Sequence, residues 1–168
     1  MGGSAVSVEP EAIPTARLEL TPLAVADAGA MATVLADERL YEYTGGEPAT
    51  AAELRGRYAR QVAGSGRPDE VWLNWIIRVG GEPVGYVQAT AEPIAGTAWV
   101  AWVIGTPWQG NGYATEAAAS VVGWLRDRGL AATAAIAPGH LASERVAAAA
   151  GLTPTDELLD GERVWRLQ

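Results

Sequence analysis

The sequence predicts an α+β domain in which a mixed, mostly antiparallel, twisted sheet of about seven strands is combined with four helices. Two periodicities predict this fold. Several short runs alternate polar and apolar residues, the period of half-buried strands, whereas others repeat apolar residues every three or four positions, the period of amphipathic helices. Three strand-like runs also follow one another closely between residues 71 and 104, the spacing of an antiparallel meander.

In the first half of the chain, residues 17–22 alternate polar and apolar and are predicted to form the first strand. Residues 26–35 have helical spacing. A second helix is expected to begin at Thr50 and to end near residue 63, because Thr50 and Glu53 have the spacing of a capping box.

In the second half, residues 71–79, 84–91 and 96–104 are predicted to form the three strands of the meander, with Gly- and Pro-containing turns between them. An amphipathic helix follows and ends at Gly129. The last elements are expected to be a strand over 131–137, a helix over 141–150 and a hairpin over 152–159 and 163–167.

The length and polarity of the chain predict one domain. At 168 residues it can bury a full core, and no apolar run approaches the roughly 20 residues that span a bilayer. Residues 1–14 lack the apolar core of a signal peptide and are expected to be a flexible tail before a single domain over 15–168. We therefore expect a cytoplasmic protein without a membrane partner.

Several kinds of chemistry are excluded by residues that the chain lacks. It has no Cys, all 12 of its basic residues are Arg, and His140 is its only histidine. Thiolate nucleophiles, Schiff-base lysines and His-rich or Cys-ligated metal sites are therefore excluded, and we expect no metal. The net charge of −8 also argues against a nucleic-acid partner.

The most informative segment is the loop that joins the predicted strand ending at Ile104 to a helix opening at Gly112. Free amides at a helix N-terminus attract anions, and glycines let a ligand approach the backbone closely. A dinucleotide fingerprint is excluded because Thr115 stands in place of its third glycine, and a P-loop is excluded because it needs Lys. A pyrophosphate site remains, although such a loop could also be a simple turn.

The motif Gln109-x-x-Gly112-x-Ala114 matches the Gln/Arg-x-x-Gly-x-Gly/Ala motif of the GNAT superfamily of N-acetyltransferases. Residues 108–117 resemble the branch that contains the ribosomal-protein N-terminal alanine acetyltransferases, and the order of elements over 17–167 resembles the superfamily as a whole. The resemblance implies splayed central strands that hold CoA. It also implies direct transfer of acetyl from acetyl-CoA, a co-substrate, to a primary amine of a small molecule or a peptide N-terminus. We expect a monomer or a homodimer.

The resemblance further implies which residues hold the cofactor. Backbone amides of the glycine loop would bind the pyrophosphate, the edge of the strand ending at Ile104 would pair with the pantetheine arm, and an amide near Val103 would stabilise the oxyanion. The expected cofactor-binding residues are Trp102, Val103, Ile104, Gln109, Gly110, Asn111, Gly112, Tyr113, Ala114, Thr115, His140 and Ser143.

A second motif concerns the departing thiolate. The branch begins its last helix with Pro-x-Asn-x-x-Ser, and residues 138–143 match this pattern except that His140 replaces Asn. The resemblance assigns Ser143 to hydrogen-bond or protonate the CoA thiolate, and His140 to contact the cofactor. Either residue could instead be a simple helix-start residue.

The general base is the least defined group. From Pro93 to Thr115 the chain has no Asp, Glu or His, although many GNAT enzymes hold a Glu there. We therefore expect the amine to lose its proton to water or to a carboxylate outside this strand, with Glu42 and Glu92 as candidates.

Residues 41–47 contain two carboxylates among aromatic residues and could form an acceptor wall suited to a cationic amine, or an ordinary solvated loop. Two other functions stay open at this point: a non-catalytic acyl-CoA-binding module that has lost turnover, and nucleotide binding without CoA.

Overall fold

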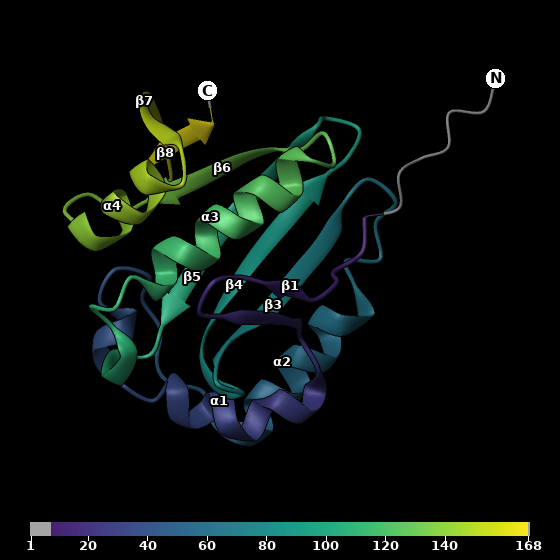
Figure 1. Cartoon of the computed structure of the whole chain (residues 1–168), viewed down its shortest axis with the longest axis vertical. Coiled ribbons are helices and arrows are strands. Elements are labelled where there is room, and N and C mark those ends of the chain that lie inside the picture. Colours follow the sequence, from purple (N-terminus) through teal and green to yellow (C-terminus); the bar gives the residue numbers. More distant parts are fainter. Residues whose placement is uncertain (1–7, 168) are drawn as a thin grey trace.

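The structure is a computed structural model that describes residues 8–167. All of its strands belong to one open sheet (Figure 1). The strand order is β1-β2-β3-β4-β5-β6-β8-β7, and every neighbouring pair is antiparallel except β5 with β6. The strands are β1 (Ile13–Pro14), β2 (Glu19–Pro22), β3 (Val71–Val79), β4 (Glu82–Glu92), β5 (Thr97–Ile104), β6 (Ala131–Ile136), β7 (Leu152–Leu159) and β8 (Glu162–Leu167).

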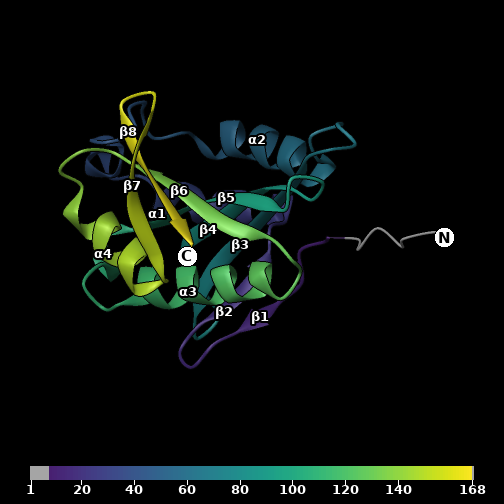
Figure 2. The same cartoon turned by 90° about the horizontal axis from the view of Figure 1, so that it is seen from above.

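Four α-helices cover the two faces of the sheet, α1 and α2 on one side and α3 and α4 on the other (Figure 2). The predicted α+β fold is therefore confirmed. The eighth strand, β1, was not predicted because two residues are too short to carry a periodic pattern. Within residues 8–167 no helix has the length and apolar character needed to cross a bilayer. The helices are α1 (Ala28–Val34), α2 (Ala51–Ala63), α3 (Tyr113–Arg126) and α4 (Leu141–Ala149).

The start of α2 is fixed by the Thr50 side chain, as the sequence predicts. The Glu53 amide donates to the Thr50 hydroxyl at 3.1 Å. The Glu53 carboxylate accepts from the same hydroxyl, also at 3.1 Å, so only the Thr50 half of the expected capping box forms.

Part of the expected N-terminal tail is packed against the sheet. Within residues 8–14, Val8 is buried, and the Glu11 carbonyl accepts a hydrogen bond from the Trp75 indole at 2.8 Å. The Glu11 carboxylate also accepts from the Trp124 indole at 2.9 Å. The expectation of a loose segment over 1–14 is therefore wrong for residues 8–14, because two buried indoles need acceptors that this segment supplies. Residues 1–7 lie outside the described part.

The central strands diverge, as the resemblance implied. β5 and β6 run parallel but pair only over Thr97–Trp99 with Ala131–Thr133, after which β5 continues to Ile104 without a partner on that side. On its other side β5 stays paired with β4 along its whole length. The result is an open strand edge beside the beginning of α3 (Figure 1).

The beginning of α3 is tied to the turn between β1 and β2. Glu116, in the first turn of α3, accepts hydrogen bonds from the Thr15 hydroxyl at 2.5 Å, the Arg17 amide at 2.8 Å and the Arg17 guanidinium at 2.7 Å. Burial acts to raise the pKa of Glu116, but these hydrogen bonds together hold it below its ordinary value. The carboxylate thus fixes the helix end that faces the open edge.

We predict that Glu116→Gln lowers the free energy of unfolding by about 1 to 2 kcal/mol at pH 7, after discounting for the exposure of Arg17. Because the pKa of Glu116 is lower in the folded state, its stabilisation is present above the unfolded pKa and is lost as the pH falls through the folded pKa. Denaturant unfolding at pH 7 and pH 4 should therefore show a smaller loss on acidification in the variant. Glu47→Gln, at an exposed site, is the control, and an equal effect of both substitutions would contradict the role of Glu116.

Candidate active site

The loop between β5 and α3 keeps the first amides of α3 free of side-chain caps. Gly112 immediately precedes the helix with φ of +79°, and Gly110 has φ of +81°, a left-handed conformation that glycine adopts at little cost. The loop is braced by its own amide side chains. Gln109 donates to the Ile104 carbonyl at 2.9 Å, and Asn111 donates to the Trp108 carbonyl at 2.9 Å. The helix end therefore offers free N–H groups to an anion.

A groove of about 730 Å³ lies between this loop, the end of β5 and the beginning of α4. All the predicted cofactor residues line it except Asn111, whose side chain folds back onto the loop. The sequence motifs at residues 109–115 and 138–143 are thus brought to one site from two sides of the diverging strands. Arg145, which also lines the groove, has no ion pair within residues 8–167 and can face a phosphate.

The direction of the β5 amides corrects one prediction. The Gly105 amide donates to the Val84 carbonyl of β4, so the alternation of an antiparallel ladder also directs the Val103 amide toward β4. The backbone amides and carbonyls of the even-numbered residues of β5 face the open edge instead. The Gly96 carbonyl accepts a hydrogen bond from the Ala131 amide at the start of β6, and the Ile104 carbonyl accepts one from the Gln109 side chain. The amides that face the groove therefore belong to Trp102 and Ile104, and the assignment of the oxyanion donor to Val103 is wrong by one residue.

Ser143 and His140 contact each other at the beginning of α4. The Ser143 hydroxyl lies 3.2 Å from His140 Nε2, and the His140 ring stacks on Tyr43 with centroids 4.1 Å apart and planes 4° apart. Burial lowers the pKa of His140, although Glu144, Glu42 and Glu162 act to raise it. A largely neutral imidazole can therefore either donate to Ser143 or accept from it.

Of the two carboxylates considered as bases, only Glu42 lines the groove. Glu92 pairs with Thr97 at the far end of β4, six residues from Tyr86, which pairs with Val103. At about 3.4 Å per residue this separation is roughly 20 Å. Glu92 is therefore wrong as a candidate base, because the sequence does not reveal which end of an antiparallel strand faces the site.

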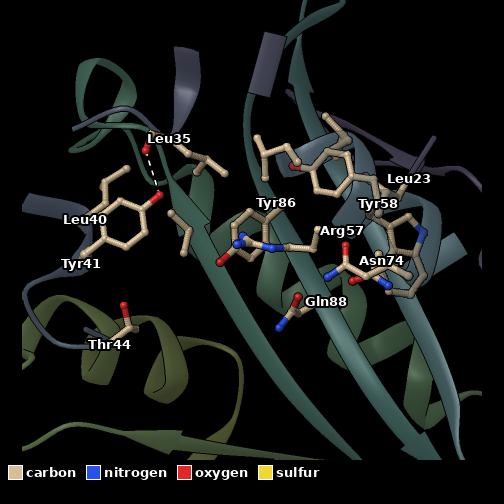
Figure 3. Close-up of a pocket in the computed structure, with 15 residues that line it drawn as sticks. Leu23, Leu35, Leu40, Tyr41, Thr44, Arg57, Tyr58, Asn74, Tyr86 and Gln88 are labelled. Carbon is tan, nitrogen blue, oxygen red and sulfur yellow. Dashed lines mark hydrogen bonds between the residues drawn. The ribbon is translucent and has the colours of Figure 1, made fainter. Parts of the chain in front are cut away.

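A second, smaller cavity of about 280 Å³ lies on the α1 and α2 side of the sheet (Figure 3). It meets the groove at Leu40 and Val103, which line both. Its floor consists of two cross-strand rows. One row places Ile76, Tyr86 and Val103 side by side on β3, β4 and β5. The next row places Asn74 beside Gln88.

The sequence suggested an acceptor wall with the two carboxylates of residues 41–47, but neither carboxylate lines this cavity. Glu42 lies in the groove and Glu47 lines neither hollow. Among residues 8–167, the only charged side chain lining the cavity is Arg57 of α2. Sequence reasoning missed Arg57, Tyr86 and Gln88. The polar alternation of Tyr86 and Gln88 in β4 could have indicated a polar face, but nothing in the sequence indicates that α2 directs Arg57 over it.

Comparison with known proteins identifies the family of the chain. Residues 17–153 match the model of the acetyltransferase (GNAT) domain family, which covers most of the chain. The protein therefore belongs to the GNAT family and is an acetyl-CoA-dependent N-acetyltransferase, as the glycine-loop motif predicted. No protein with curated annotation is detectably similar in sequence.

Solved structures with the same fold include a CoA complex of RimL, a ribosomal L7/L12 α-N-protein acetyltransferase, with a TM-score of 0.79 and 18% identity over 93% of this chain and 97% of that one. RimJ of Mycobacterium smegmatis has a TM-score of 0.80 and 18% identity over 94% and 87% of the chains. The aminoglycoside acetyltransferase AAC(6')-Ib has a TM-score of 0.72 and 20% identity over 89% and 92%. These likenesses agree with the predicted branch, and they concern the fold.

We predict that Gly112→Val abolishes acetyl-CoA binding, because a branched side chain would stand where the pyrophosphate must reach the backbone. Titration calorimetry with acetyl-CoA measures the effect. In the unsubstituted protein, ligand at 100 times its dissociation constant should add about 2.7 kcal/mol of stability.

The matched control for this substitution is Gly129→Val at the other end of α3. Gly129 has φ of +77°, so the control introduces the same backbone strain far from the groove. Folded Gly112→Val protein that binds acetyl-CoA as tightly as Gly129→Val protein would contradict the loop assignment.

Proposed function

We propose that this protein transfers the acetyl group of acetyl-CoA to a primary amine that enters from the smaller cavity. The observation that carries the proposal is the junction of the two hollows at Val103, because a cofactor in the groove and an amine in the cavity would meet there. The free amides at the beginning of α3 suit the pyrophosphate. The unpaired edge of β5 suits the pantetheine arm, which would add to it like a further strand.

The chemistry follows from these positions. The amine nitrogen attacks the thioester carbon directly, and a groove-facing amide of Trp102 or Ile104 stabilises the oxyanion of the tetrahedral intermediate. The C–S bond then breaks, and the thiolate takes a proton. Holding the two substrates at one junction supplies the orientation that a direct transfer needs, without a covalent enzyme intermediate.

The proposed acid is Ser143, with His140 as its positioning partner. The hydroxyl lies in the groove within hydrogen-bond distance of the imidazole, and no hydrogen bond to a helix amide competes for it within residues 8–167. Proton transfer from Ser143 to the thiolate would be balanced by return of a proton from water, while the neutral His140 imidazole holds the hydroxyl in place by a hydrogen bond. Ser143 would thus keep the role that the Pro-x-Asn-x-x-Ser pattern implies, although His140 replaces the Asn of that pattern.

The proton of the attacking amine goes to water or to Glu42. In the part of the chain that the structure describes, no carboxylate lines the cavity, and Glu42 is the only carboxylate that lines the groove. Water is sufficient for an α-amine, whose unperturbed pKa of about 7.7 to 8.0 leaves an appreciable free-base fraction at neutral pH.

We predict that Ser143→Ala lowers kcat at least 10-fold while the KM for acetyl-CoA changes little, because the hydroxyl acts on charge that develops only as the C–S bond breaks. Release of the CoA thiol with a panel of amines measures turnover. Ser120→Ala is the control, since its hydroxyl bonds the Glu116 carbonyl within α3. Intact turnover in Ser143→Ala would assign Ser143 to the helix end alone, and no thiol release by the unsubstituted protein with any amine would favour an acyl-CoA-binding module.

We also predict that the pH profile of kcat/KM follows the pKa of the acceptor amine and shifts between acceptors of different basicity. The reason is that the described residues of β5 provide no general base. Initial rates from pH 5.5 to 9.5 with two acceptors of different pKa check this. A limb fixed near pH 6 to 7 for both acceptors, and lost in Glu42→Gln, would show that the enzyme uses a carboxylate base instead.

A further inference from the structure

We propose that the acceptor amine carries an anionic group, a carboxylate or a phosphate, and that Arg57 binds this group in the smaller cavity. The inference rests on the proposed function, because it treats the cavity as the acceptor site. It reverses the expectation of a wall of carboxylates for a cationic amine.

The charge of the cavity favours an anion. Among the residues that line it, all within the described part of the chain, Arg57 is the only one with a charge, and none is acidic. A polycation would find no counterion there and would face the guanidinium at close range, which is unfavourable. An anion would find a guanidinium whose planar fork matches a carboxylate or a phosphate.

Polar side chains of the cavity also lack protein partners. Within residues 8–167, the Arg57 guanidinium forms no ion pair, and neither it nor the side chains of Asn74, Tyr86 and Gln88 form a hydrogen bond. Polar groups that line a cavity and form no hydrogen bonds with one another are expected to bind a polar ligand. Figure 3 shows Arg57 beside Tyr86, with Asn74 and Gln88 on the same side.

The side chains around Arg57 also suit an anion. Arg57 lines the cavity together with Tyr58 and Tyr86. Burial raises the pKa of Tyr86 and raises that of Tyr58 to about 12, although Arg57 acts to lower both, so the two hydroxyls stay neutral. Arg57 itself is exposed, so its guanidinium borders the cavity on the solvent side, where an entering anion can accept hydrogen bonds from it and from the neutral hydroxyls. Arg78, in contrast, is already paired with Asp27 at 2.6 Å.

The size of the cavity limits the acceptor. Its volume of about 280 Å³ lies just below the range of about 300 to 1,000 Å³ that is usual for drug-sized ligands. Tyr86, next to Arg57, is paired with Val103, and adjacent strands are about 4.8 Å apart. Because Arg57 and Val103 line the same cavity, an anion on Arg57 and an amine at the transfer point would lie within its span. A small amino acid or an amino phosphate fits within this span.

The test compares acceptors of similar length that differ in charge. Candidates are 3-aminopropanoate, 2-aminoethyl phosphate, the neutral 3-aminopropanamide and the dication of 1,4-diaminobutane. CoA thiol release gives kcat/KM for each with the unsubstituted protein, with Arg57→Gln, and with Arg55→Gln as control. Arg55 is an exposed residue of the same helix that does not line the cavity, so the control makes the same change in net charge.

We expect Arg57→Gln to lower kcat/KM at least 10-fold for the carboxylate, the phosphate or both, and to change it less than 3-fold for the neutral amide. Comparing variant with unsubstituted protein for one acceptor cancels differences in amine basicity. The better of the two anionic acceptors identifies which anion the site prefers. Arg55→Gln should leave all four values unchanged.

Two results would overturn the inference and leave the proposed function standing. One is a preference of the unsubstituted protein for the neutral amide or the diamine. The other is an equal loss for all four acceptors in Arg57→Gln, which would mean that Arg57 supports the fold only. No thiol release with any of the amines would instead contradict the proposed function and the inference with it.

Discussion

The separation of β5 from β6 is the constraint on which the site depends. The two strands pair over three residues and then diverge, which leaves the edge of β5 from Val100 to Ile104 without a neighbour. Backbone N–H and C=O groups at such an edge lack hydrogen-bond partners in the sheet, and an extended ligand can supply them. Because α3 begins beside the open end of this edge, amides from a strand and amides from a helix face the same groove.

The same strand separates two chemical environments. On one side the groove gathers the free amides of α3 together with His140, Ser143 and Arg145. On the other side, the cavity under α1 and α2 is lined by tyrosines, by Asn and Gln side chains and by Arg57. The hollows meet at Leu40 and Val103, which line both, and the backbone amide of Val103 is directed toward β4. Rigid pairing of β4 with β5 along the whole of β5 holds this junction in place.

Much of the fold and of the groove could be predicted from the sequence, because both rest on local signals. Periodicity located every strand except β1, and the glycine loop with its Gln located the cofactor groove. The errors concern long-range geometry. Strand pairing decides that Glu92 lies far from the site and that the Val103 amide is directed toward β4, and helix packing decides that Arg57 lines the same cavity as Tyr86. None of these relations leaves a pattern within a single segment of sequence.

A crystal structure of the protein with bound CoA would test the central claim most directly. The account predicts pyrophosphate oxygens within about 2.7 to 3.2 Å of amides at the beginning of α3, a hydrogen-bond distance. It also predicts pantetheine along the open edge of β5, and sulfur near Val103 and the Ser143 hydroxyl. CoA bound away from the β5 edge, or a thiol on the side of the sheet away from the smaller cavity, would contradict the account.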